Sequence, residues 1–265
     1  MSRKDRDGFT LMELLLVIGI IALLAALLLT AVARSHSAAL RIHCENNVRQ
    51  VGIGLLAFVT DHSAYPLCRN PDFYTGGYPE HMTMWMLALQ YTEISAPGNA
   101  TNRIPFSKWA GQGVWKCPGA SQPLDWPTNQ LYISYGYNYS GTSKRSDTHS
   151  LGLGGHLMWS TPGSPAPPVR ESEVASPSEM MAIGDGLVGG SGVIRDGVRA
   201  LGRASDAQDY FGSTKRSYTR HQGKANVVFC DGHVESPALK RLFEDTDDAA
   251  LVRWNRDHQP HRNGP

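Results

Sequence analysis

Residues 9–33 read FTLMELLLVIGIIALLAALLLTAVA, an apolar run in which Glu13 is the only charged side chain. A membrane-spanning helix needs about 20 predominantly apolar residues, so this run is long enough to cross a bilayer with some tilt. Residues 1–8 read MSRKDRDG, and their basic side chains favour a cytoplasmic N-terminus. The sequence therefore predicts a single-pass anchor in the inner (cytoplasmic) membrane, with the rest of the chain on the periplasmic or extracellular side.

Glu13 is the residue that a plain signal anchor does not explain. An acidic side chain at the centre of a membrane helix costs roughly 2.5–3.5 kcal/mol, and less near the interface, so it usually has a partner. A cleaved secretory signal peptide is also disfavoured, because its apolar region spans only about 7–15 residues. The position of Glu13 therefore indicates a more specialised segment.

Beyond the apolar run, hydrophobic residues recur at steps of three and four, which predicts an amphipathic helix. These residues are Leu40, Cys44, Val48, Val51, Leu55 and Phe58. Since no helix breaker separates the two segments, we expect one continuous helix from about Phe9 to Asp61. Gly52 and Gly54 weaken its outer half, and we expect a strand to pack closely over them.

The chain after about Tyr65 is rich in glycine, proline, tryptophan and tyrosine, with short apolar runs between turn signals. This composition favours mostly antiparallel β structure with long loops. The predicted fold class is α+β, with a long N-terminal helix packed on a β-rich domain. The predicted segments are a leader at 1–8, a transmembrane helix at 9–33, its amphipathic continuation at 34–62, the β-rich domain at 63–245 and a C-terminal tail at 246–265.

Residues 225–235, which read ANVVFCDGHVE, predict a β-hairpin. An Asp-Gly pair between apolar strands is a strong hairpin signal, and we take Asp231 and Gly232 as a two-residue turn. In this register Phe229 faces Val234, and the two share the buried face. We expect a helix or buried segment at 82–91, an exposed linker at 161–168 and a strand within 179–186.

The cysteines and the net charge limit the classes of site. The formal net charge is +1, so no global basic excess suggests nucleic-acid binding. The cysteines are far apart and form no C-x-x-C pair, which argues against a structural zinc site or a redox motif. One or two disulfides could form after export, with three full pairings, although isolated buried cysteines are equally ordinary. The residues concerned are Cys44, Cys68, Cys117 and Cys230.

The order Gly8-Phe9-Thr10-Leu11-Met12-Glu13 resembles the processing site of type IV prepilins and type II secretion pseudopilins. The resemblance implies that a prepilin peptidase cuts after Gly8 and that the new N-terminal Phe9 is methylated. It also implies that the carboxylate of Glu13 meets the terminal amine of a neighbouring subunit, which offsets the cost of burying it. Thr30 stands about where pilins often carry proline, so a proline kink is not expected there.

Further elements resemble one branch of these proteins, the DUF1559 or H-X9-DG group. His221 is followed by nine residues and then Asp231-Gly232, which matches the element that names the group. The other matching elements are Asn46-Asn47, Gln50-Val51-Gly52, Tyr65-Pro66, the K-C-P step within 115–118 and the S-Y-x-x-N-Y step within 133–139.

The histidine and the aspartate of this element should lie at opposite ends of a strand, because six extended residues span roughly 20 Å. His221 and Asp231 are therefore not expected to share a metal ion, and Asp231 is expected to serve the turn geometry. No other cofactor is expected, but since some secretion pseudopilins hold calcium with loop acids, a calcium site remains open. Its candidate ligands are Asp185, Asp196, Asp206 and Asp209.

Two functions of different classes follow. The first is a prepilin-like or pseudopilin-like structural subunit that assembles through its N-terminal helix with copies of itself or other pilin subunits. The second is a membrane-anchored exported β domain that binds a ligand such as a glycan without polymerising. An enzyme is not expected, because the chain has no nucleophile elbow, phosphate loop or H-E-x-x-H motif.

Overall fold

The computed structural model describes residues 10–67, 113–119, 135–143, 149–156, 167–185, 221–243, 245 and 247–261. Gly8, Phe9, the expected segment at 82–91, most of the expected linker and the loop region 187–218 lie outside these ranges.

The dominant element is the helix α1, which runs without interruption from Leu11 to His62. Thr10 caps its N-terminus, and Ser63 ends it in the left-handed conformation at φ 53°. At about 1.5 Å per residue the helix is roughly 78 Å long. Thr30 donates a hydrogen bond to the carbonyl of Leu27 at 2.9 Å without breaking the helix. The predicted continuous helix is therefore confirmed.

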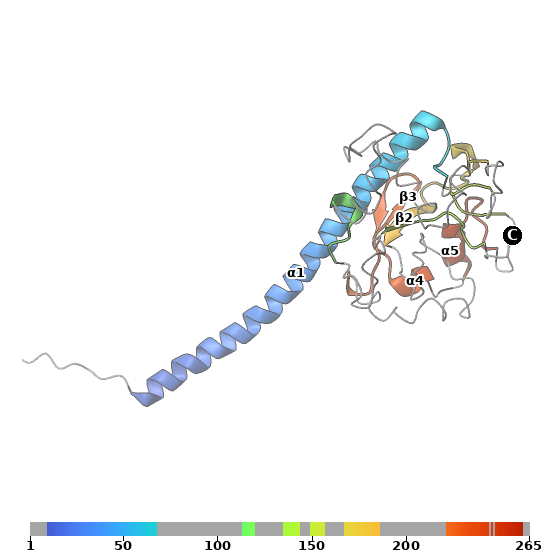
Figure 1. The fold of residues 1–265 in the computed structure, drawn as a ribbon. Helices are drawn as coiled ribbons and strands as arrows, with labels where there is room; N and C mark the ends of the chain where they lie inside the picture. Colours follow the sequence, from blue (N-terminus) through green and yellow to red (C-terminus); the bar gives the residue numbers. More distant parts are fainter. Residues whose placement is uncertain are drawn as a thin grey trace, which may run out of the picture.

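The two halves of α1 have different surroundings (Figure 1). The N-terminal half projects away from the globular part, and its large apolar side chains, from Leu11 to Val32, are exposed. The outer half lies against the domain and buries a stripe at helical spacing, as its periodicity predicts. The buried residues are Cys44, Asn47, Val48, Val51, Gly52, Gly54, Leu55 and Val59.

The outer half of α1 covers a four-stranded antiparallel sheet with the strand order β1-β2-β3-β4. The strands are β1 (Tyr135–Tyr137), β2 (Met181–Asp185), β3 (Val227–Phe229) and β4 (Val234–Glu235). Figure 1 shows α1 passing over β3 and β2. The α+β class and the long helix on an antiparallel sheet are as predicted, and β2 lies within the expected strand.

The predicted hairpin forms, but its register differs by one residue. Val228 pairs with Val234, and the amide of Phe229 donates to the carbonyl of His233 at 2.9 Å. The loop is therefore the three residues 230–232, with Gly232 in the left-handed region at φ 90°, as in a common three-residue hairpin. The prediction that Phe229 and Val234 share a face was wrong, because the extra loop residue moves them to opposite faces.

The two faces of the sheet bury separate apolar clusters. Val228 and Val234 belong to the cluster under α1, whereas Phe229 belongs to a second cluster on the far side. The second cluster includes residues of two short helices near the C-terminus, α4 (Leu239–Phe243) and η7 (Val252–Trp254), and α5 (Asp248–Leu251) leads directly into η7. Trp254 is only 1% exposed, so the segment expected as a tail contributes to the core. Two further 3₁₀ turns are η4 (Gly113–Trp115) and η5 (Glu171–Glu173).

A buried asparagine links the sheet to the C-terminal helices. Asn138 lies just beyond β1, and its side-chain amide donates to the carbonyls of Met181 at 2.8 Å and Trp254 at 2.9 Å. Its side-chain oxygen accepts from the amide of Gly141 at 3.1 Å. Because a buried polar group is costly unless it is hydrogen-bonded, this side chain fixes η7 against the start of β2.

The strand β3 approaches α1 closely at Gly52. A β-carbon built there would lie 2.5 Å from Cγ2 of Val228, closer than any ordinary contact. The glycine therefore lets β3 approach the helix backbone, which agrees with the strand expected over this position.

We predict that Gly52→Ala lowers the free energy of unfolding of the globular part by about 1–2 kcal/mol. Overpacking of this kind costs up to about 3 kcal/mol, while alanine gains only about 1 kcal/mol of helix propensity. The measurement is urea unfolding of the detergent-solubilised full chain, followed by near-ultraviolet circular dichroism. Adding Val228→Ala removes the overlapping methyl groups, so the double variant should be more stable than the sum of the single losses implies. An unchanged or more stable Gly52→Ala chain would contradict the packing argument.

Candidate functional site

Glu13 takes part in a capping box at the N-terminus of α1. Its Oε2 accepts hydrogen bonds from the backbone amide of Thr10 at 2.9 Å and from the Thr10 hydroxyl at 2.8 Å. In return, the Thr10 hydroxyl accepts from the amide of Glu13 at 3.2 Å. The residues that follow the predicted cleavage point therefore form a self-capped helix start, with the carboxylate at its outer surface.

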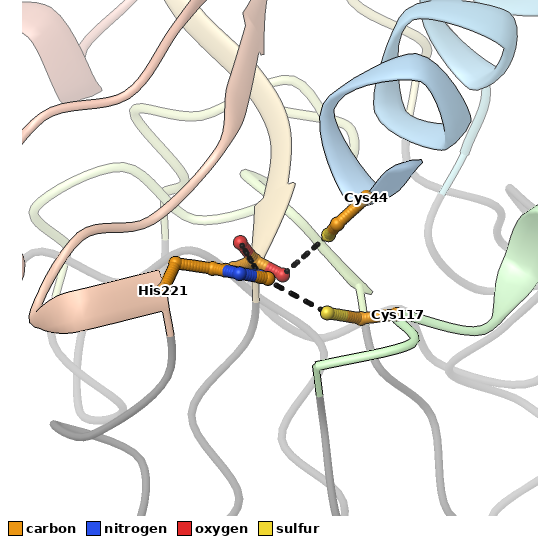
Figure 2. Close-up of side chains that lie close together, drawn as sticks. Cys44, Cys117 and His221 are labelled. Carbon is orange, nitrogen blue, oxygen red and sulfur yellow. Dashed lines mark hydrogen bonds and ion pairs between the residues drawn. The ribbon is translucent and has the colours of Figure 1, made fainter. Parts of the chain in front are cut away.

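A second group of functional side chains lies buried between α1 and the domain. Cys44 comes from α1, Cys117 from the segment after η4, Asp185 from the end of β2 and His221 from the turn before β3. One potential ligand atom from each lies within 4.8 Å of all the others. Figure 2 shows Cys44, Cys117 and His221 directed toward a common point. Each residue is at most 5% exposed.

Neighbouring residues position the group. Cys44 lies on the apolar stripe of α1, and the Asn47 side chain, one turn further along, donates to the carbonyl of Lys116 at 2.9 Å. This hydrogen bond holds the segment that carries Cys117 against the helix. Gly119 leaves space for the imidazole, because a β-carbon there would lie 2.8 Å from Cε1 of His221.

The contacts within the group centre on His221 and Asp185. Nε2 of His221 lies 3.0 Å from Sγ of Cys117 and 3.3 Å from Oδ2 of Asp185. The thiol of Cys44 donates to Oδ1 of Asp185 at 3.4 Å. Oδ2 of Asp185 also accepts from the backbone amide of Asn226 at 2.8 Å, and the hydroxyl of Tyr135 lies 3.2 Å from Sγ of Cys44.

These surroundings set the protonation states. The contact with Cys117, together with burial, raises the pKa of Cys44, so this thiol is neutral. Burial alone would lower the pKa of His221, but the hydrogen bond and charge of Asp185 outweigh it and raise this pKa to about 9. At neutral pH the group therefore contains an imidazolium–carboxylate pair beside a neutral thiol.

The geometry differs from that of a cysteine–histidine catalytic relay. In such a relay the nucleophile contacts one imidazole nitrogen and the orienting carboxylate contacts the other. Here Cys117 and Asp185 both approach Nε2. The potential ligand atoms of the four side chains thus converge on one point inside the protein. Ligands surround a metal ion in the same way.

The other predicted site residues are placed as follows. Cys44, Cys117 and Cys230 are buried free thiols in the structure, and Cys68 lies outside the described residues. Burial raises the pKa of Cys230 to about 12. Asp185 has sulfur neighbours, which do not suit calcium, an ion that prefers oxygen ligands. Asp196, Asp206 and Asp209 lie outside the described residues.

The two ends of the H-x9-D-G element make separate contacts. His221 belongs to the buried group, whereas Asp231 lies in the exposed hairpin loop. There Oδ1 of Asp231 accepts from the backbone amide of His233 at 3.1 Å and lies 2.6 Å from its Nδ1. Gly232 follows, and a β-carbon on it would lie 2.5 Å from Cδ1 of Leu56. The aspartate and glycine therefore shape the loop and let it pack on α1.

Comparison with protein families found a match to the prokaryotic N-terminal methylation motif over residues 3–29. The chain carries a prepilin-type N-terminal methylation motif. This motif implies processing by prepilin peptidase and a membrane-anchored, exported protein. Among the described residues, α1 is long and apolar enough to span a membrane: its most apolar 18-residue window has a mean hydropathy of 3.0 and is 0% buried in the protein. Comparisons with curated proteins and with solved structures gave no match.

Sequence reasoning missed the buried group because its members come from four distant segments. The absence of a C-x-x-C pair argued against a zinc site, but that argument covers only ligands that are neighbours in the chain. The available signals were weak: Cys44 lies on the apolar stripe of the helix, and Asp185 ends a strand.

We predict that the two ends of the H-x9-D-G element differ sharply in their effect on stability. His221→Ala should lower the free energy of unfolding by about 3–5 kcal/mol, because it removes the charged partner of the buried Asp185 carboxylate. Asp231→Ala should cost about 1 kcal/mol, because its contacts lie at the exposed loop. Urea unfolding of both full-length variants measures the difference, and equal losses would show that the two ends do not act separately.

Proposed function

We propose that the chain is a pseudopilin-like structural subunit, cleaved between Gly8 and Phe9 and assembled through α1 into a pilus-like or type II secretion filament. The observation that carries the proposal is the exposed apolar half of α1, most of which lies within the matched methylation motif and which contains Glu13. Within the membrane these side chains would face lipid, and in a filament they would face neighbouring helices.

The geometry of Glu13 supports a contact between subunits. Both hydrogen bonds from Thr10 end on Oε2, so a cation can approach through the other carboxylate oxygen. Cleavage after Gly8 would create a charged amine on Phe9, which stands four residues before Glu13 in the sequence. An amine from a neighbouring subunit would neutralise Glu13 in the apolar interior of a filament, where an unpaired charge is costly.

The proposal also covers the membrane topology of the chain and the group of prepilin-type proteins to which it belongs. The basic leader favours a cytoplasmic N-terminus and a domain on the periplasmic or extracellular side. The elements from Asn46 to Gly232 favour the DUF1559, H-X9-DG group. The alternative, an anchored β domain that binds a ligand without polymerising, shares the anchor but gives the charge of Glu13 no role.

We predict that the native protein begins with an N-methylated Phe9 in cells that contain prepilin peptidase. The recognition pattern and the family match both cover the cleavage point. Mass spectrometry of the N-terminal peptide measures this, with peptidase-deficient cells as the control. A native protein that retains residues 1–8 in the presence of the peptidase would refute the processing step.

We also predict that Glu13→Gln reduces crosslinking between subunits about as strongly as Glu13→Ala. Glutamine can retain the capping box with Thr10 but has no charge, so this pair of variants separates helix capping from charge pairing. Glu45→Ala is the matched control, because it removes a carboxylate from the same helix outside the apolar run. The measurement is crosslinking in membranes, with membrane insertion checked in parallel.

If Glu13→Gln crosslinks as the parent does while Glu13→Ala does not, the carboxylate would act only as a cap and the charge mechanism would fail. If no subunit crosslinks are found even for the parent, the protein would be the non-polymerising alternative.

A further inference from the structure

We propose that Cys44, Cys117, Asp185 and His221 together bind one zinc ion that fastens α1 to the globular domain. The four side chains come from α1, the segment after η4, β2 and the turn before β3, and their donor atoms lie within 4.8 Å of one another. Figure 2 shows the three labelled side chains surrounding a common point at the face of α1.

The distances suit tetrahedral zinc. Zinc binds thiolate sulfur at about 2.3 Å and imidazole nitrogen or carboxylate oxygen at about 2.0–2.2 Å, so tetrahedral ligand atoms lie about 3.3–3.8 Å apart. Nε2 of His221 lies 3.0 Å from Sγ of Cys117 and 3.3 Å from Oδ2 of Asp185, and Sγ of Cys44 lies 3.4 Å from Oδ1 of the same carboxylate. One donor atom from each of the four residues lies within 4.8 Å of all the others. The short contacts would open by a few tenths of an ångström to reach these tetrahedral separations, and the longest would close by at most about 1 Å.

The chemistry of the donors selects the metal. Two thiols and an imidazole favour zinc, whereas calcium and magnesium take oxygen ligands. Four protein ligands complete a tetrahedron and leave no position for a substrate, which is the arrangement of a structural site.

The surroundings also suit a bound metal. Zinc with two thiolates, one carboxylate and a neutral imidazole carries one net negative charge, which needs hydrogen-bond donors around it. The backbone amide of Asn226 lies 2.8 Å from Oδ2 of Asp185, and the hydroxyl of Tyr135 lies 3.2 Å from Sγ of Cys44. Such outer contacts orient metal ligands and stabilise the site.

The competing use of the two thiols is a disulfide between Cys44 and Cys117. A disulfide would involve only two of the four side chains and would not explain why His221 and Asp185 converge on the same point. Zinc gives all four a role and links the helix to three separate segments of the domain.

The test is metal analysis of the full-length chain, purified in detergent without chelator. Elemental mass spectrometry should find about one zinc per chain. After exchange, Co²⁺ should give thiolate-to-cobalt charge-transfer bands and the intense visible bands of a tetrahedral site. Removing the metal with a chelator should lower the thermal midpoint by about 10 °C, because the metal binds only the folded chain.

Matched cysteine variants locate the metal. The Cys68→Ser/Cys230→Ser double variant leaves Cys44 and Cys117 as the only thiols and should keep the cobalt bands. Cys117→Ser should lose about half of the thiolate charge-transfer intensity, because Cys44 remains, and bind zinc at least tenfold more weakly. If Cys117→Ser does not fold, the cobalt spectrum of the double variant decides the question alone.

Two results would overturn the proposal. One is a Cys44–Cys117 disulfide found by peptide mapping of the native chain. The other is a reduced, folded chain that takes up neither zinc nor cobalt through thiolate. Neither readout depends on N-terminal cleavage or on assembly, so the zinc site and the proposed function can fail independently.

Discussion

The close approach of β3 to the backbone of α1 at Gly52 is the contact on which the rest of the structure depends. Hydrophobic burial requires the outer half of the helix to face a sheet, and the missing side chain at Gly52 lets Val228 sit against the helix itself. That approach sets the depth at which β2 and β3 lie under α1. It thereby brings the end of β2, with Asp185, to Cys44 on the helix.

The same contact explains how the H-x9-D-G element extends over two sites. His221 lies before β3 and reaches the buried group, while the loop after β3 packs Gly232 beneath Leu56. The strand between them lies against the helix at Val228. The nine residues between His221 and Asp231 are thus the length of chain that passes under α1 and turns back.

Local patterns predicted the elements well because each depends on neighbouring residues. The apolar run, the stripe from Leu40 to Phe58 and the Asp-Gly signal gave α1 and the hairpin. The hairpin register was missed because two-residue and three-residue loops both accept Asp-Gly, and the packing of Gly232 on Leu56 is a long-range contact. The buried group was missed for a related reason: Cys44 and His221 become neighbours only when helix and sheet pack, and no sequence spacing records that.

The uninterrupted course of α1 has a geometric consequence for the whole molecule. Between Val32, at the end of the exposed apolar half, and Cys44, the first buried position, the helix forms a stiff spacer of about 18 Å. The rotation between the two ends of the spacer is also fixed, because each residue turns the helix by about 100°. The number of residues in this spacer therefore sets the rotational orientation of the domain around the helix axis. A subunit held by its apolar half would present the same side of its domain at every repeat of an assembly.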